Sequence, residues 1–195
     1  MSRSTSAYHH GNLPEALERA AMGLLETQPA AEISLRAVAR EAGVSHNAPY
    51  HHFGDRKALL KVLAERSMSA LLESQRTSTR DGAPAMRLRA LAHDYVTFAS
   101  ARPHVFAVIY DPSVCVPGSP TETMAPLIAA EEALLADTVR AALPEIEGQA
   151  AASMAAAMWG TVHGLAQLSQ AGHLPLEGAL SAVDALLDRV VASDG

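Results

Sequence analysis

The chain has 195 residues, of which 49% are hydrophobic and 18% are charged, and its formal net charge is −6. This composition excludes a disordered chain and is typical of a globular protein with a buried core. The single cysteine excludes an internal disulfide framework. The first residues lack a signal peptide, and no run of about 18 apolar residues could span a membrane. We therefore expect a cytoplasmic protein without a membrane segment.

Charge is divided unevenly along the chain. Residues 1–83 contain ten Lys and Arg against nine Asp and Glu, whereas residues 84–195 contain five against twelve. Five of the nine histidines also lie within the first 52 residues. The asymmetry predicts a near-neutral or slightly basic N-terminal part on an acidic C-terminal part, so the negative net charge does not exclude a polyanionic partner.

The first third of the chain predicts four helices separated by helix breakers. Pro14 lies just inside the first helix. Ser34 can cap a short second helix, and Gly43 can end it because glycine readily adopts the left-handed conformation. A third short helix begins near His46 or Asn47, and Asp55 can cap a longer fourth helix.

Later breakers divide the rest of the chain in the same way. Asp81–Pro84, Pro103 and Pro144 interrupt the helical pattern, and "DPSVCVPGSP" (111–120) is a loop by composition. We find no convincing strand and no internal repeat, so the predicted fold is all-α. The expected segments are a helix through 88–98, a short apolar segment at 104–110, and helices at about 123–143, 145–171 and 176–190.

The stretch "GVSHNAPYHHFGD" (43–55) combines a glycine turn with a short polar helix. Two short helices joined by "EAGVS" form the helix-turn-helix pattern, in which the first packs beneath a second that is free to enter the major groove. Ser45 is placed to cap that second helix. Pro49 is tolerated in its first turn because those N–H groups have no intrahelical acceptor. Phe53 is expected to anchor it to the core.

A family resemblance follows from these residues. "ISLRAVAREAGVSHNAPYHHFGDRKALL" (33–60) resembles the DNA-binding domain of TetR-family transcriptional regulators. "YHHGNL" (8–13) and "MWGTVHGLAQLSQAGHL" (158–174) resemble a subgroup with a C-terminal Trp-His-Gly signature, here Trp159, His163 and Gly164. The positions that match the family pattern of the helix-turn-helix are Gly43, Val44, Ser45, Tyr50, His52 and Phe53.

This resemblance implies a three-helix helix-turn-helix DNA-binding domain (1–55) and a helical effector-binding and dimerisation domain (56–195). It implies a repressor that binds a palindromic operator in double-stranded DNA as a homodimer. A small apolar or aromatic effector would release it by shifting the helix that begins at Asp55. No cofactor is implied.

The alternative is a helical small-molecule-binding protein, or a minor enzyme, that only retains a helix-turn-helix. The sequence shows no nucleophile–base pair, no Gly-rich phosphate loop and no carboxylate dyad, so we do not expect an enzyme. The histidine pairs at 9–10 and 51–52 lack ligand spacing, so we expect no metal site.

The outer face of the third helix supplies candidate DNA contacts. Asn47 can bond an adenine edge and His46 a guanine, although Asn47 is equally suited to cap the helix. Tyr50 is suited to donate to a phosphate, the alternative being a partly buried core tyrosine. The full set is Ser34, Arg36, Ser45, His46, Asn47, Ala48, Tyr50, His51, His52, Arg56 and Lys57.

Aromatic and soft apolar side chains recur at helical spacing in the C-terminal part. Such a pattern is most often plain core, but as a set these residues can line a cavity for an effector. The candidates are Tyr95, Phe98, Phe106, Tyr110, Met124, Met158, Trp159 and His163.

Two later segments favour a homodimer interface over an intramolecular core. "AAASMAAAM" (150–158) allows close helix contact, and the last helix has a 4-3-4-3 apolar spacing that suits a four-helix contact. The interface candidates are Leu165, Leu176, Leu180, Val183, Leu187 and Val190.

Overall fold

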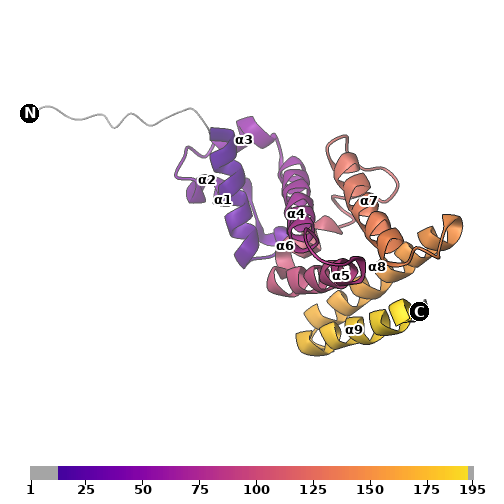
Figure 1. Cartoon of the computed structure of the whole chain (residues 1–195). Coiled ribbons are helices and arrows are strands. Elements are labelled where there is room, and N and C mark those ends of the chain that lie inside the picture. Colours follow the sequence, from indigo (N-terminus) through magenta and orange to yellow (C-terminus); the bar gives the residue numbers. More distant parts are fainter. Residues whose placement is uncertain (1–12, 193–195) are drawn as a thin grey trace, which may run out of the picture.

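The computed structural model describes residues 13–192, and every regular element in that range is a helix (Figure 1). This confirms the predicted all-α fold. The histidine pair at 9–10 and most of "YHHGNL" lie outside the described residues. The elements are α1 (Leu13–Thr27), the 3₁₀ helix η2 (Ala30–Glu32), α2 (Leu35–Glu41), α3 (Ala48–Phe53), α4 (Arg56–Ser78), α5 (Pro84–Ala101), α6 (Pro103–Ile109), α7 (Met124–Ala142), α8 (Gly148–Gln170) and α9 (Leu176–Ala192).

Helices α1 to α3 form a compact N-terminal unit that we call the head (Figure 1). The Ser34 hydroxyl accepts the Ala37 backbone N–H at 3.1 Å, so α2 begins where the sequence predicts. Gly43 has φ of 66°, a left-handed conformation that suits glycine, and the chain turns there toward α3. Phe53 is buried at the end of α3, which fixes that helix to the rest of the head.

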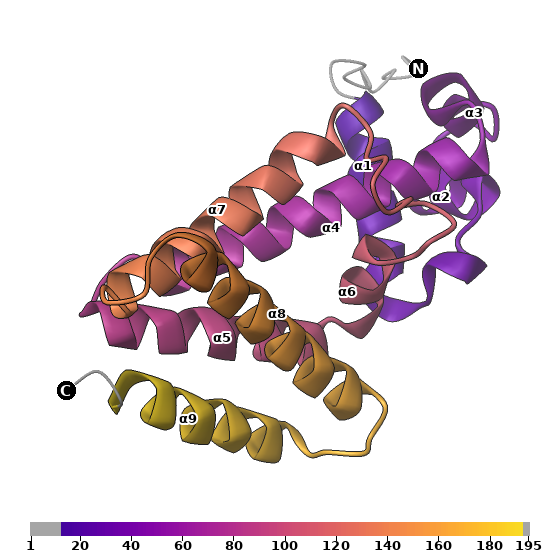
Figure 2. The ribbon, with the colours of Figure 1, turned by 90° about the vertical axis from the view of Figure 1, so that its right-hand side faces the viewer.

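Helix α4 joins the head to the remaining helices, α5 to α9, which we call the body (Figures 1 and 2). The Asp55 carboxylate caps it by accepting the Ala58 backbone N–H at 2.8 Å, as predicted. It contacts α1 and α3 of the head as well as α5, α6 and α7 of the body. Any displacement of α4 therefore acts on both parts.

Two apolar cores stabilise the described residues. The first joins the head to α4 and α6 and contains Leu17, Leu63 and Phe106. The second lies in the body between α5, α7, α8 and α9 and contains Leu88 and Val183. Figure 2 shows α7 alongside α4, and α9 alongside α5, in agreement with the helix contacts. The body therefore covers α5 from several sides.

Candidate functional sites

The turn between α2 and α3 has the geometry of a helix-turn-helix. The Val44 backbone N–H donates to the Ala39 carbonyl at 3.0 Å, and Val44 is partly buried against the first core. The N-cap residue of α3 is Asn47, and no side chain makes a capping bond there. The expected Ser45 cap is therefore wrong, and the capping role for Asn47 is not observed. Pro49 is buried in the first turn, as its tolerance there allows.

Most of the candidate DNA contacts lie on the surface. Tyr50 is 46% exposed, so it is not the partly buried core residue of the alternative interpretation. Ala48 is half-buried. The exposed candidates are Ser34, Arg36, Ser45, His46, Asn47, Tyr50, His51, His52, Arg56 and Lys57. The assignment of DNA contacts among them stays a prediction.

Besides Ser34, which caps α2, two of these candidates have polar partners within the chain. The Arg56 guanidinium donates to the backbone carbonyls of Ala30 at 2.9 Å, Ala31 at 2.9 Å and Ile33 at 3.1 Å. It therefore fastens the segment before α2 to the start of α4. Backbone carbonyls far away in the sequence leave no pattern that a sequence analysis can detect. Arg56 was therefore predicted as a cation free to contact DNA.

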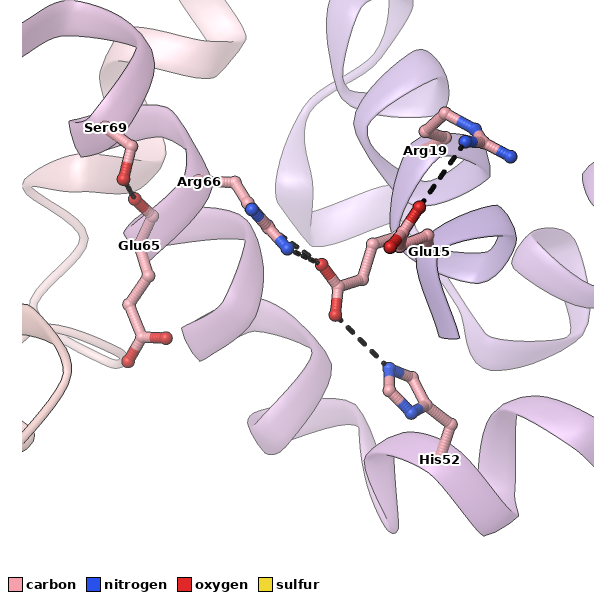
Figure 3. Close-up of polar contacts among 7 residues, drawn as sticks. Glu15, Arg19, His52, Glu65, Arg66 and Ser69 are labelled. Carbon is pink, nitrogen blue, oxygen red and sulfur yellow. Dashed lines mark hydrogen bonds and ion pairs between the residues drawn. The ribbon is translucent and has the colours of Figure 1, made fainter. Parts of the chain in front are cut away.

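The second is His52, whose ring joins a cluster that connects three helices. His52 Nε2 lies 3.4 Å from Glu18 Oε1, so α3 is linked to α1. Arg66 of α4 binds the other oxygen of the same carboxylate, with its Nε at 2.8 Å (Figure 3). Glu18 thus connects α4 to α3, which is the second helix of the helix-turn-helix and is called the recognition helix below. The predicted DNA contact of His52 would compete with this pairing.

A second ion pair connects α1 to the body. The Arg102 guanidinium, between α5 and α6, binds the carboxylate of Glu26 near the end of α1, and it also lies 5.0 Å above the Phe98 ring. Because α6 contacts both α1 and α4, this pair fastens the head where the body begins. Helix α1 is therefore connected to α4 through Glu18 and to the junction of α5 and α6 through Glu26.

The body contains a cavity of about 740 Å³, within the usual range for small-molecule sites of about 300–1,000 Å³. Its walls come from α4, α7, α8 and the segment from Ile109 to Thr121. Of the predicted residues, Tyr110, Met124 and Trp159 line it. Trp159 is 42% exposed, so this indole lies where the cavity meets solvent.

The other predicted cavity residues lie elsewhere. Phe98 and Phe106 are buried core, which is the ordinary interpretation of the aromatic pattern, and their assignment to the cavity is wrong. Tyr95 and Met158 line a small neighbouring void of about 30 Å³ that shares Trp159 with the cavity.

Hydrogen bonds join the aromatic residues beside the cavity. The Tyr95 hydroxyl lies 2.7 Å from the Tyr110 hydroxyl and 2.9 Å from His163 Nδ1. Burial raises the pKa of both tyrosines and lowers the pKa of His163, so all three are neutral near pH 7. The Trp159 ring lies 5.8 Å from the His163 ring. His163 therefore lies within the aromatic cluster behind the wall, although it does not line the cavity.

Ionisable residues of the cavity wall were missed in the sequence. Glu131 of α7 lines both the cavity and the small void, and burial raises its pKa to about 7, with a smaller contribution from Glu132. The sequence pattern could have identified Glu131. Ile128, Glu131 and Leu135 follow each other at helical spacing, which places a carboxylate on an apolar helix face.

Helix α4 contributes the remaining charges of the wall. Lys61 and Glu65 line the cavity one helical turn apart. The Glu65 carboxylate accepts the Thr121 hydroxyl at 2.8 Å and also the Thr123 hydroxyl, which joins α4 to the segment before α7. Glu65 therefore helps to hold that wall of the cavity in place.

The apolar stripe of α9 faces the chain's own body. Val183 and Leu187 are buried in the second core together with Leu88 and Val96 of α5, so their predicted role as exposed interface residues is wrong. A stripe shows that a helix is covered but does not identify what covers it. The remaining candidates, Leu165, Leu176, Leu180 and Val190, are half-buried. The exposed large apolar residues of α8 and α9 are Trp159, Leu168 and Leu186.

Metal ligands and membrane spans are both absent from the described part of the chain. Between residues 13 and 192, no group of three or more His, Cys, Asp and Glu side chains is arranged to hold a metal ion. None of the helices there is both long enough and apolar enough to cross a membrane.

Comparison with protein families places two domains on the chain. Residues 18–63 match the bacterial regulatory proteins of the tetR family, and residues 88–193 match the tetracyclin repressor-like C-terminal domain. The first range contains α2, α3 and the turn between them. No curated protein shows significant sequence similarity to the chain.

Solved structures share the whole fold. A protein of unknown function from Rhodococcus sp. RHA1 is 33% identical, with a TM-score of 0.80 over 94% of this chain and 97% of the other. A transcriptional regulator from Rhodococcus sp. Rha1 is 24% identical, with a TM-score of 0.72 over 92% and 96% of the two chains. The TetR family transcriptional regulator PfmR from Thermus thermophilus is 18% identical, with a TM-score of 0.64 over 91% and 97%. The last two show similarity of fold alone.

The family match extends over both parts of the molecule, and the helix-turn-helix has the expected geometry. The chain therefore belongs to the TetR family of bacterial regulatory proteins and is a DNA-binding transcriptional regulator.

Proposed function

We propose that the protein is an effector-responsive repressor that binds a palindromic operator as a homodimer. The observation that supports this proposal is that α4 extends from the end of α3 to the cavity. Its first residues follow α3 directly, and farther along Lys61, Glu65 and Met68 line the cavity. Occupation of the cavity therefore acts on the helix that supports the recognition helix.

Several finer assignments belong to the same proposal. Residues 1–55 form the DNA-binding domain, and residues 56–195 form the effector-binding and dimerisation domain. The protein acts in the cytoplasm and is not an enzyme. Trp159, His163 and Gly164 of α8 support the Trp-His-Gly subgroup, because two of them belong to the aromatic cluster beside the cavity.

The proposed DNA contacts use the exposed end of α3. Asn47 and His46 read base edges, and neither side chain is used to cap the helix. Tyr50 and His51 donate to phosphate oxygens, which positions the helix without specifying sequence. Arg56 acts instead by holding the segment before α2 in place.

The proposed homodimer uses the outer faces of α8 and α9. Leu168 and Leu186 are exposed there, 46% and 37% respectively, and a two-fold partner would cover them. A two-fold dimer also matches a palindromic operator, whose half-sites lie about 34–36 Å apart. The distance between the α3 helices of the two protomers then decides whether both can enter successive major grooves of the operator.

The proposed effector response passes through two adjacent residues of α4. Glu65 lines the cavity, and Arg66 binds Glu18, which in turn pairs with His52 of α3. A shift of α4 on effector binding therefore moves the recognition helix. The operator is released when the two recognition helices no longer match successive major grooves.

Fluorescence anisotropy with the DNA that flanks the protein's own gene tests this function. We expect affinity to fall with salt, with a logarithmic slope of about −0.9 for each phosphate contacted. Asn47→Ala should flatten the preference at one base pair per half-site, at a cost of about 1–3 kcal/mol, while Tyr50→Phe lowers affinity equally for all operator variants.

A control variant and a decisive negative result complete the test. Glu145→Gln, exposed in the segment between α7 and α8, should leave operator binding unchanged. If no salt concentration yields a complex, and the protein instead turns over a small molecule, the alternative of a helical ligand-binding protein or enzyme replaces this proposal.

A further inference from the structure

The cavity combines an acidic wall with aromatic rings. Three glutamates, at 65, 131 and 132, line it against one lysine, at 61. The other lining residues are mostly apolar, including Ile109, Met124 and Ile128. An apolar molecule fills such a space, and the excess of carboxylates favours one that carries positive charge.

The two carboxylates of α4 and α7 differ in how they are satisfied. Glu65 accepts two threonine hydroxyls and lies one turn from Lys61, so its charge is partly offset. Glu131 has neither a cationic partner nor a hydrogen-bond donor among the described residues, and its half-buried side chain lines the cavity and the small void together with Trp159. A carboxylate that is partly withdrawn from water and has no partner is costly to ionise, and a cation in the cavity would reduce that cost.

The rings beside Glu131 provide the second half of the argument. Tyr110 and Trp159 line the cavity together with Glu131, and Trp159 also shares the small void with it. Aromatic faces attract ammonium and guanidinium groups, and the attraction grows when water is excluded. A carboxylate next to two such rings favours a cation over an anion or a neutral molecule.

We propose that the cavity binds an apolar or aromatic cation, with its positive group beside Glu131 and the rings of Tyr110 and Trp159. This inference rests on the effector response proposed above, and it names the chemical class of the effector. Burial of Glu131 and its pKa of about 7 are consistent with a carboxylate that becomes charged when the cation enters.

Trp159 is the single tryptophan of the chain, so its fluorescence reports binding directly and without DNA. The probe is 4-phenylbutyl-trimethylammonium, compared with its neutral isostere, in which carbon replaces nitrogen, and with the anion 5-phenylpentanoate. We expect the cation to bind at least about tenfold more tightly than either of the others.

Three variants locate the effect. Glu131→Gln should lower the affinity for the cation toward that for the isostere, with the remaining difference due to the aromatic rings, and leave the affinity for the isostere unchanged. Glu131→Asp keeps the charge and should retain the preference for the cation. Glu122→Gln removes an exposed carboxylate that does not line the cavity, and it should bind as the wild type does. Circular dichroism checks that each variant is folded.

The pH dependence provides an independent readout. The cation should bind more tightly as pH rises through about 7 in the wild type, because Glu131 loses its proton, and Glu131→Gln should lack this rise. The other ionisable groups that face or line this region are Lys61, Glu65, Glu132, Tyr95, Tyr110, Cys115 and His163, and all remain in the variant.

The outcomes separate this inference from the proposed function. The inference is overturned if the anion binds more tightly than the cation, if millimolar cation leaves Trp159 fluorescence unchanged, or if Glu131→Gln binds the cation as the wild type does. If the cation binds at Glu131 but operator complexes persist, the proposed effector response fails while the cavity assignment stands.

Discussion

The head and the body fold by the same means but differ in what they bury. The head encloses apolar side chains such as Leu17 and Val38, and its polar groups lie outside or in helix caps. The body and α4 enclose polar groups: of the described buried side-chain atoms, those without a partner belong to Ser67, Gln75 and Asp94, all on α4 or α5. The comparison indicates that the head is packed with its buried polar groups satisfied, whereas α4 and the body, which enclose the cavity, are packed less completely.

The largest expected effect contrasts one leucine from each region. Leu17→Ala removes a fully buried side chain from the head and should lower the free energy of unfolding by about 2–5 kcal/mol. Leu135→Ala trims the wall of an existing cavity, so it should cost only about 1 kcal/mol. Urea denaturation measures both. Equal losses would contradict the claim that the body is less tightly packed.

The second effect concerns pH and the buried carboxylate. The pKa of Glu131 rises from 4.5 in the unfolded chain to about 7 on folding, so between these pH values only the folded chain holds the proton. The contribution of Glu131 to stability therefore falls as pH rises through this window, at most about 1.4 kcal/mol per pH unit.

Glu131→Gln isolates that contribution. We expect the variant to match the wild type near pH 4.5 and to exceed it by about 2 kcal/mol at pH 8, after an allowance for water in the cavity. Urea titrations at the two pH values measure the difference. A difference that does not change with pH would show that Glu131 is solvated in the folded protein.

The third effect is the loss of one hydrogen bond in the aromatic cluster. Tyr110→Phe removes the 2.7 Å bond to Tyr95, whose hydroxyl keeps its contact with His163. Stability should fall by about 1 kcal/mol, with operator binding unchanged. The matched control is Tyr50→Phe in the head, which should do the opposite: lower operator affinity and leave the melting temperature unchanged.

The smallest effect on stability is expected at the link between the two regions. Glu18→Gln weakens the contacts with Arg66 and His52, and because Arg66 is 56% exposed the cost should stay below about 1 kcal/mol. The same change should reduce the loss of operator affinity that an effector causes. A double-mutant cycle with Arg66→Gln measures the coupling, and purely additive effects would exclude this route.

The head could be predicted almost fully because its signals are local. Ser34 and Asp55 cap their helices, and Gly43 adopts a left-handed conformation, each through contacts within four residues. Such contacts depend on residue type and spacing alone. The exposed face of α3 follows from the same local pattern once Phe53 is assigned to the core.

The cavity and the helix contacts of the body could not be predicted in this way. The wall at Glu131 exists only because α7 lies alongside α4, and the carbonyl acceptors of Arg56 come from a segment more than twenty residues earlier. The stripe with Val183 and Leu187 was assigned to a partner chain, whereas α5 covers it. Spacing along one helix shows which face is buried but does not identify the neighbour.

The neighbouring positions of Glu65 and Arg66 on α4 have an evolutionary consequence. Glu65 contacts the cavity and the segment before α7, and Arg66 binds Glu18 of the head, so a substitution in this turn of α4 alters both ligand choice and signal transmission. Residues of α7 and of the segment 114–120 line the cavity but take no part in the ion-pair cluster of Glu18, His52 and Arg66. Descendants of this chain should therefore acquire new ligands by substitution there, while this turn of α4 changes slowly.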